Sequence, residues 1–200
     1  MKTKIRILQD KLAILKAALS TRRSEQYCLK LWSEFIRLRD GHCIACGTKK
    51  FLAAHHIFRK SFLIGARFDT GNGISLCKSC HEEPHESFNR KANLGLPMDA
   101  EDGEKIELAL AFLTYLIEDA KKQKLLRDDF YYFSDQALIT FKKFQTIDAD
   151  LKFPGLRIEQ AQLIWDQTPR CMMEAILNAN GFDLPKDFIQ RRSGILFFIE

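Results

Sequence analysis

The sequence predicts an α+β fold in which a small strand–loop–strand–helix module lies between N-terminal helices and a mostly helical C-terminal region. Apolar residues recur at spacings of three and four near both ends of the chain, which is typical of amphipathic helices. Between residues 42 and 91 the sequence changes to turn residues and short apolar runs, and this stretch contains two Cys-x-x-Cys pairs and all five histidines. We therefore divide the chain into segments 1–40, 41–92 and 98–200.

Length and composition favour a packed globular protein. The 200 residues are 46% hydrophobic and include 16 Phe, which is enough for a substantial core. The N-terminal segment carries charges every few positions, and it has neither the apolar region of a signal peptide nor a run that can span a bilayer. We expect a soluble, cytoplasmic protein with no membrane partner.

Charge is unevenly distributed along the chain. Residues 1–92 carry 18 Lys and Arg against 8 Asp and Glu, whereas residues 93–200 carry 13 against 18, which together give the net charge of +5. A phosphate-binding surface needs an excess of basic residues, because counterion release supplies much of nucleic-acid affinity. The basic half therefore favours a nucleic-acid partner, and the acidic half is expected to face something else.

Two amphipathic helices are predicted before the module. The first has an apolar stripe over residues 5–19, and the second covers residues 24–38 and stops at Gly41. The stripe predicts packing within the chain, and a short coiled-coil seam for self-association is the alternative. It consists of Ile5, Leu8, Leu12, Leu15 and Leu19.

The module itself is expected to begin with strands at Phe51–Ile57 and Ile74–Leu76, followed by a helix over Lys78–Lys91 with Pro84 near its start. The stretch Asn93–Pro97 is the predicted linker.

The C-terminal segment predicts further helices. A long amphipathic helix is expected over Ile106–Leu126. Thr168-Pro169 has the pattern of an N-cap followed by a first-turn proline, and Gly181 is placed to end that helix. The apolar residues in Gly194–Glu200 predict a terminal strand or a buried tail.

Four of the six cysteines form the pairs Cys43-x-x-Cys46 and Cys77-x-x-Cys80. Without an export signal these thiols would stay reduced, so the pairs indicate metal ligands rather than disulfides. Two such pairs can close a tetrahedral site for a structural zinc ion, which stabilises small peptides by roughly 10–16 kcal/mol. Mixed ligation by thiolate and imidazole is the alternative. The remaining cysteines, interpreted as small buried hydrophobes, are Cys28 and Cys171.

A second group of polar side chains lies between the cysteine pairs and just after them. His55 and His56 are adjacent on the first predicted strand, so they point to opposite faces and are expected to have different functions. His81 and His85 lie four residues apart on the predicted helix and therefore share one face. Asn72 precedes the second strand.

The stretches CIAC, AAHHIF, TGNGISLC and CKSCHEEPH occur in this order over residues 40–88. They resemble the HNH endonucleases, specifically the branch in which two Cys-x-x-Cys pairs bracket the active site. The resemblance implies a zinc-stapled ββα-metal module that hydrolyses phosphodiester bonds in DNA. It fits an enzyme of a phage, a mobile element or an anti-phage defence system, and equally a host repair enzyme.

The resemblance also implies a role for each residue of the second group. His55 and His81 would bind a catalytic divalent cation, which is Mg²⁺, Mn²⁺, Ni²⁺ or Zn²⁺, and His85 matches a third ligand that occurs in some members. His56 would be the general base, and Asn72 would hydrogen-bond and orient it. An imidazole with a pKa of about 6.5 can take a proton from water at neutral pH. The implied products have 5′-phosphate and 3′-hydroxyl ends.

Three cations in the loop between the strands, Arg59, Lys60 and Arg67, are candidates for contacts with flanking phosphates, although ordinary surface positions explain them equally well. His42 lies outside the pattern and is expected to face solvent.

Two other functions compete with the nuclease interpretation. In the first, the cysteines hold the fold, the basic surface binds nucleic acid and the histidines only pack, so that the protein is a zinc-stabilised binding module. In the second, the nuclease is an effector whose activity depends on a protein partner docked on the acidic half. That half can equally be a solvated helical region that extends the core.

Overall fold

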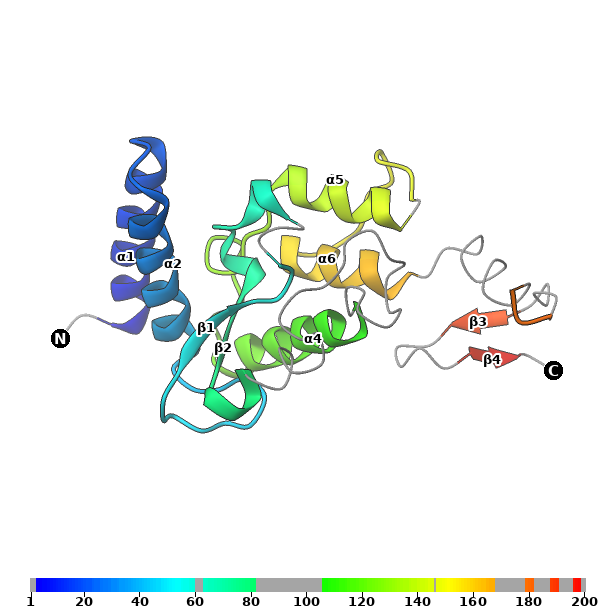
Figure 1. Ribbon diagram of the computed structural model, residues 1–200, viewed down its shortest axis with the longest axis horizontal. Coiled ribbons are helices and arrows are strands. Elements are labelled where there is room, and N and C mark those ends of the chain that lie inside the picture. The colour runs from blue at the N-terminus through cyan, green and yellow to red at the C-terminus, as the bar shows by residue number, and fades with distance from the viewer. Residues whose placement is uncertain are drawn as a thin grey trace.

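A two-stranded antiparallel sheet lies at the centre of the fold, with helices on both sides (Figure 1). The computed structural model describes residues 3–59, 63–81, 106–145, 147–167, 179–181, 188–190 and 196–198. Strand β1 (Ala53–His56) pairs with β2 (Gly73–Leu76) in the register that puts His56 opposite Gly73. Helices around a small sheet confirm the predicted α+β class, and both strands lie at the expected positions.

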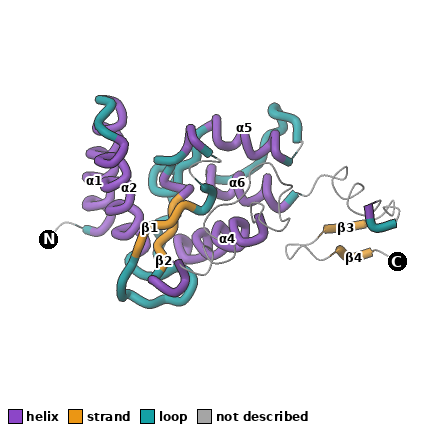
Figure 2. The backbone as a smooth tube through the Cα atoms, in the orientation of Figure 1, coloured by secondary structure: helices purple, strands orange, loops and turns teal. Residues whose placement is uncertain are grey.

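Two antiparallel helices form one side of the molecule (Figures 1 and 2). Helix α1 covers Lys4–Ser20 and α2 covers Glu25–Asp40. The hydroxyl of Ser24 accepts from the N–H of Tyr27 at the start of α2, and Gly41 ends it in the left-handed conformation at φ 74°. The predicted stripe of α1 packs within the chain, although Ile5 is 38% exposed. The buried α1 residues are Leu8, Leu12, Leu15 and Ala18.

The C-terminal segment supplies the other side. Helix α4 covers Ile106–Lys122, α5 covers Asp135–Phe144 and α6 covers Arg157–Asp166. A second antiparallel pair joins β3 (Phe188–Gln190) to β4 (Leu196–Phe198). No helix among the described residues is both long enough and apolar enough to cross a bilayer.

Some predicted elements differ from the structure in their bounds or fall partly outside the described residues. The long helix begins at the predicted residue and ends at Lys122 instead of Leu126. Strand β4 lies within the segment for which a terminal strand was one expectation. Residues 78–81 are helical, as expected for the start of the module's helix. The rest of that helix, the linker at 93–97, the N-cap at Thr168 and Cys171 lie outside the described residues.

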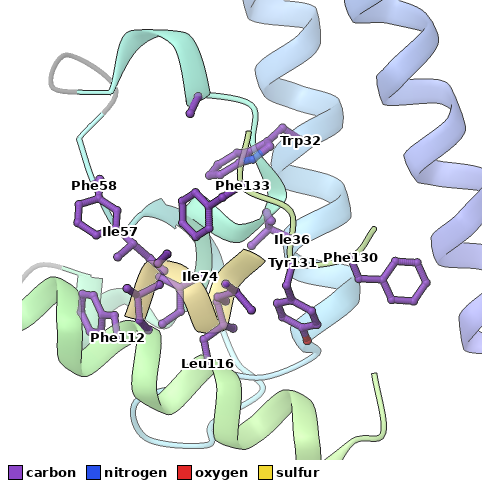
Figure 3. Close-up of a cluster of buried hydrophobic side chains, with 14 of the residues drawn as sticks. Trp32, Ile36, Ile57, Phe58, Ile74, Phe112, Leu116, Phe130, Tyr131 and Phe133 are labelled. Atoms are coloured by element: carbon purple, nitrogen blue, oxygen red, sulfur yellow. The ribbon is translucent and has the colours of Figure 1, made fainter. Parts of the chain in front are cut away.

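The hydrophobic core is continuous through all three segments of the chain. Figure 3 shows side chains of α2, including Trp32 and Ile36, and side chains of α4, including Phe112 and Leu116, around Ile74 of β2. The sheet therefore packs against α2, which precedes the first cysteine pair in the sequence, and against α4, which follows the second pair.

The chain before α5 is hydrogen-bonded to the loop that connects β1 to β2. This loop contains two short 3-10 helices, Ile64–Ala66 and Thr70–Asn72. The N–H of Gly71 donates to the carbonyl of Tyr132 at 2.8 Å, and the N–H of Tyr132 donates to the hydroxyl of Thr70 at 2.9 Å. The acidic half thus holds the loop that leads into β2.

Candidate functional site

The four paired cysteines form one cluster. Their Sγ atoms all lie within 4.8 Å of one another, and those of Cys46 and Cys77 are 3.6 Å apart. Zn–S bonds of about 2.3 Å in a tetrahedron place neighbouring sulfurs about 3.8 Å apart. The geometry of the sulfurs and their chemistry therefore suit a metal ion such as zinc, as the spacing of the cysteines predicted.

Local backbone geometry brings the first pair into position. The N–H of Cys43 donates to the carbonyl of Thr48, and the N–H of Gly47 donates to the carbonyl of Cys43, both at 2.7 Å. Gly47 has φ 77°, a conformation that glycine adopts without steric cost. The N–H of Ile44 donates to the carbonyl of Ser75 on β2 at 2.9 Å, so this turn is fixed to the sheet.

Hydrogen bonds prepare part of the cluster for a cation. The hydroxyl of Ser79, followed by the backbone N–H of Cys80, lowers the pKa of Cys77 to about 6. Burial, reinforced by Cys77, raises the pKa of Cys80. A metal binds the thiolate form, so Cys77 is the thiol that the protein itself already favours as a ligand.

The structure brings two of the predicted imidazole ligands together. The ring of His55 on β1 and the ring of His81 lie 5.0 Å apart between centroids and are perpendicular to each other. Phe112 of α4 borders this pair, with its ring centroid 6.2 Å from that of His55. Two imidazoles at this separation can converge on one ion. The predicted third ligand, His85, lies outside the described residues.

His56 has a different environment from its neighbour. Its ring is stacked on the indole of Trp32, with centroids 4.1 Å apart and an angle of 10° between the planes. Its Nε2 lies 2.8 Å from the carbonyl oxygen of Arg67. A carbonyl only accepts, so Nε2 carries the hydrogen, and in the neutral ring Nδ1 carries the lone pair. His55 and His56 thus differ in their contacts, as strand alternation predicted.

Asn72 is fully buried, and its side chain bonds to the backbone of Phe58. Its Oδ1 accepts from the N–H of Phe58 at 2.8 Å, and its Nδ2 donates to the carbonyl of Phe58 at 3.1 Å. This differs from the expected hydrogen bond to the imidazole of His56. Asn72 instead fixes the chain two residues after His56, and the carbonyl of Arg67 holds the ring.

Two of the three cations predicted to contact phosphates are among the described residues. The guanidinium of Arg67 forms an ion pair with Glu25 of α2 at 2.9 Å, and its side chain is 33% exposed. Arg59 is partly buried, and Lys60 lies outside the described residues.

His42, which was expected to face solvent rather than to bind a metal, is partly exposed and also has a partner on α4. Its Nε2 lies 3.0 Å from a carboxylate oxygen of Asp119 on α4, and the His42 side chain is 26% exposed. Helix α4, which provides this partner, is distant in sequence, so the pattern around His42 gave no signal for the contact.

Two groups that shape the site have no obvious signal in the sequence. Trp32 reads as one more apolar residue on an amphipathic helix, yet it lies against His56. Arg39 reads as a cation in the last turn of a helix, yet it is fully buried and bonds to Asp40. Only an alignment of related chains could have singled out either residue from sequence.

No family model matches the chain, and no match was found among curated proteins or solved structures. The functional interpretation therefore depends on the residues and their arrangement.

Proposed function

We propose that this protein is a metal-dependent HNH-type endonuclease that hydrolyses phosphodiester bonds in DNA. The observation that supports it best is the pair of adjacent histidines on β1. His55 approaches His81, whereas His56 is held by a backbone carbonyl with its Nδ1 as the basic atom. One histidine suited to bind a cation beside one suited to accept a proton is the combination that metal-assisted hydrolysis needs.

The reaction follows from this division of labour. Nδ1 of His56 takes a proton from water, the water oxygen forms a bond to phosphorus, and the bond from phosphorus to the 3′ oxygen breaks. The leaving oxygen takes a proton from solvent, which gives 3′-hydroxyl and 5′-phosphate ends. When bound by His55 and His81, a divalent cation supplies charge stabilisation for the leaving oxygen.

The ligand atoms also influence which divalent cation supports cleavage. Imidazole suits first-row transition ions and zinc, whereas Mg²⁺ prefers oxygen ligands. His55 and His81 both offer nitrogen. We therefore expect Mn²⁺ and Ni²⁺ to support cleavage at lower concentrations than Mg²⁺.

The four-cysteine cluster is assigned a structural role. Its thiols belong to the turn after α2 and to the residues just after β2, so a zinc ion there would fix these two parts of the module to each other. We infer that the protein works in the cytoplasm, because a reducing compartment keeps such thiols available to a metal.

The experiment is cleavage of supercoiled plasmid by zinc-loaded protein, with EDTA, Mg²⁺, Mn²⁺ or Ni²⁺ added. We expect metal-dependent nicking that falls about 100- to 10,000-fold in His56→Ala, which is the usual contribution of a general base. His42→Ala is the matched control, because it removes a histidine that pairs with Asp119 instead. Equal cleavage by His56→Ala and the wild type would refute the assignment of the base.

The alternative is a zinc-stabilised nucleic-acid-binding module, which the cysteine cluster favours because four thiols complete a zinc site without any histidine. Metal counting separates the two functions. The nuclease should bind a second metal equivalent, and His55→Ala and His81→Ala should each remove it. The binding module should slow the migration of plasmid on a gel, bind one metal equivalent and cleave no DNA.

A further inference from the structure

Helix α2 lies outside the segment that carries the HNH-like motif, yet it provides the surface on which His56 rests. The indole of Trp32 is 2% exposed, and the imidazole of His56 is stacked on it almost parallel, at 4.1 Å between centroids. Such close parallel contact restricts how the imidazole turns, because any large rotation would drive its edge into the indole.

The indole is itself held in place from two other directions. Its Nε1 donates to the carbonyl of Asp69 at 3.2 Å, in the loop between the strands. Gly73, the cross-strand partner of His56, also lies against the indole. A Cβ at position 73 would be only 2.6 Å from Cζ2 of Trp32. Trp32 therefore fills the space beside the imidazole that any larger residue at 73 would occupy.

A second contact from α2 reaches the residue whose carbonyl accepts from His56. Glu25, in the first turn of the helix, pairs with the guanidinium of Arg67 at 2.9 Å. The carbonyl of the same Arg67 accepts from Nε2 of His56. One helix thus supplies the indole beside the imidazole and an ion pair to the side chain of Arg67, whose carbonyl bonds the imidazole.

We propose that Trp32 is a positioning residue for His56, so that the N-terminal helical hairpin completes the active site. The torsion that turns an imidazole about Cβ–Cγ is broad, and a single hydrogen bond at Nε2 leaves part of that rotation open. The stack fixes the plane of the ring, and the carbonyl of Arg67 fixes the rotation within it. Together they direct Nδ1 along one line. This inference rests on the proposed function for its catalytic consequence only.

The test combines NMR of histidine-labelled protein with plasmid kinetics. A ring stacked on an indole is shielded, so we expect the imidazole protons of His56 to resonate upfield of those of the other histidines. Trp32→Leu should abolish this displacement and Trp32→Phe should retain part of it. Trp165→Phe, at the chain's second tryptophan, should leave it unchanged, because that ring stacks on Phe58 instead.

Kinetics then show whether the orientation matters for cleavage. We expect Trp32→Leu to lower kcat about 10- to 100-fold with little change in KM, as misplacement of a catalytic group does, and Trp32→Phe to recover most of it. In a His56→Ala background, Trp32→Leu should have no additional effect.

The two hypotheses can fail separately. Wild-type protein whose His56 protons lack the upfield displacement overturns the positioning role even if Trp32→Leu fails to fold, as does Trp32→Leu that cleaves with wild-type kcat. A displaced His56 resonance in a zinc-loaded protein that cuts no DNA supports the orientation by Trp32 and refutes the nuclease.

Discussion

The guanidinium of Arg39 and the carboxylate of Asp40 form a fully buried ion pair, with Nε 2.7 Å from Oδ1. The other donors of Arg39 reach three carbonyls, those of Thr70, Gly73 and Phe130. The second oxygen of Asp40 accepts from the N–H of Ser75 on β2 at 2.7 Å. The end of α2 is thereby bonded to β2, to the loop before it and to the segment before α5.

Removing one member of this ion pair should strongly destabilise the folded protein. Arg39→Met leaves the charge of Asp40 buried without its partner and three carbonyls without a donor, so we expect a loss of about 3–5 kcal/mol in the free energy of unfolding. Urea denaturation of the zinc-loaded protein measures it. Arg127→Met is the matched control at a partly exposed pair with Asp129, where we expect about 0–1 kcal/mol. Similar losses in both variants would contradict the role given to Arg39.

Gly71 provides a second test, of the contact between the loop and the acidic half. A Cβ at this position would lie 2.7 Å from the ring of Phe133 and 2.9 Å from the backbone oxygen of Tyr132. We expect Gly71→Ala to cost about 1–3 kcal/mol, the usual range for overpacking. At Gly65 the nearest atom would be 3.8 Å away, on the side chain of Gln136, so Gly65→Ala should be neutral or slightly stabilising. Thermal melting of both variants decides, and equal melting temperatures would argue against the tight fit.

Features that depend on local spacing were predictable from the sequence. Cys43 and Cys77 begin Cys-x-x-Cys turns, and such turns determine their own geometry, so the cluster followed from the pattern. Strand alternation likewise predicted different surroundings for His55 and His56. Helix α2 ended at Gly41 as expected, because an αL glycine stop is a local signal.

Contacts between distant segments were not predictable. The partner of Asn72 is the backbone of Phe58, and that of His42 is Asp119, 77 positions away. The predicted second helix includes Trp32, but hydrophobic periodicity carries no information about which residue in another segment this side chain touches. A buried charge such as Arg39 also reads like any exposed charge until the fold places carbonyls around it.

We expect substitution of a cysteine in the cluster, but not of a cysteine outside it, to remove the bound metal ion. Cys77→Ala removes the thiol with the lowered pKa of about 6, so we expect zinc content near zero after gel filtration and a lower melting temperature. Cys28→Ala is the matched control, because Cys28 is buried in the core away from the cluster and should leave zinc content unchanged. Elemental analysis of both proteins measures the outcome. Full zinc retention by Cys77→Ala would exclude ligation by all four thiols.

Asp69 links stability to pH at the loop that supports Trp32. Burial raises the pKa of this carboxyl, and the backbone N–H of Ser134, which donates to Oδ2 at 2.7 Å, only partly offsets it. A carboxyl pKa that is higher in the folded state than in the unfolded state means that the ionised form costs stability above the folded pKa. That cost disappears as pH falls through the folded pKa towards the ordinary value of about 3.9.

Asp69→Asn should therefore stabilise the protein at neutral pH, since an amide oxygen can still accept from Ser134 and carries no charge to bury. We expect the advantage over the wild type to be full at pH 7 and to shrink as pH falls towards 4, because the wild-type carboxyl then becomes neutral as well. Asp150→Asn is the control at an exposed aspartate, where we expect less than about 0.5 kcal/mol of change. Urea midpoints of the three proteins between pH 7 and pH 4 measure the difference. An advantage that grows as pH falls would show that the carboxylate of Asp69 stabilises the loop instead.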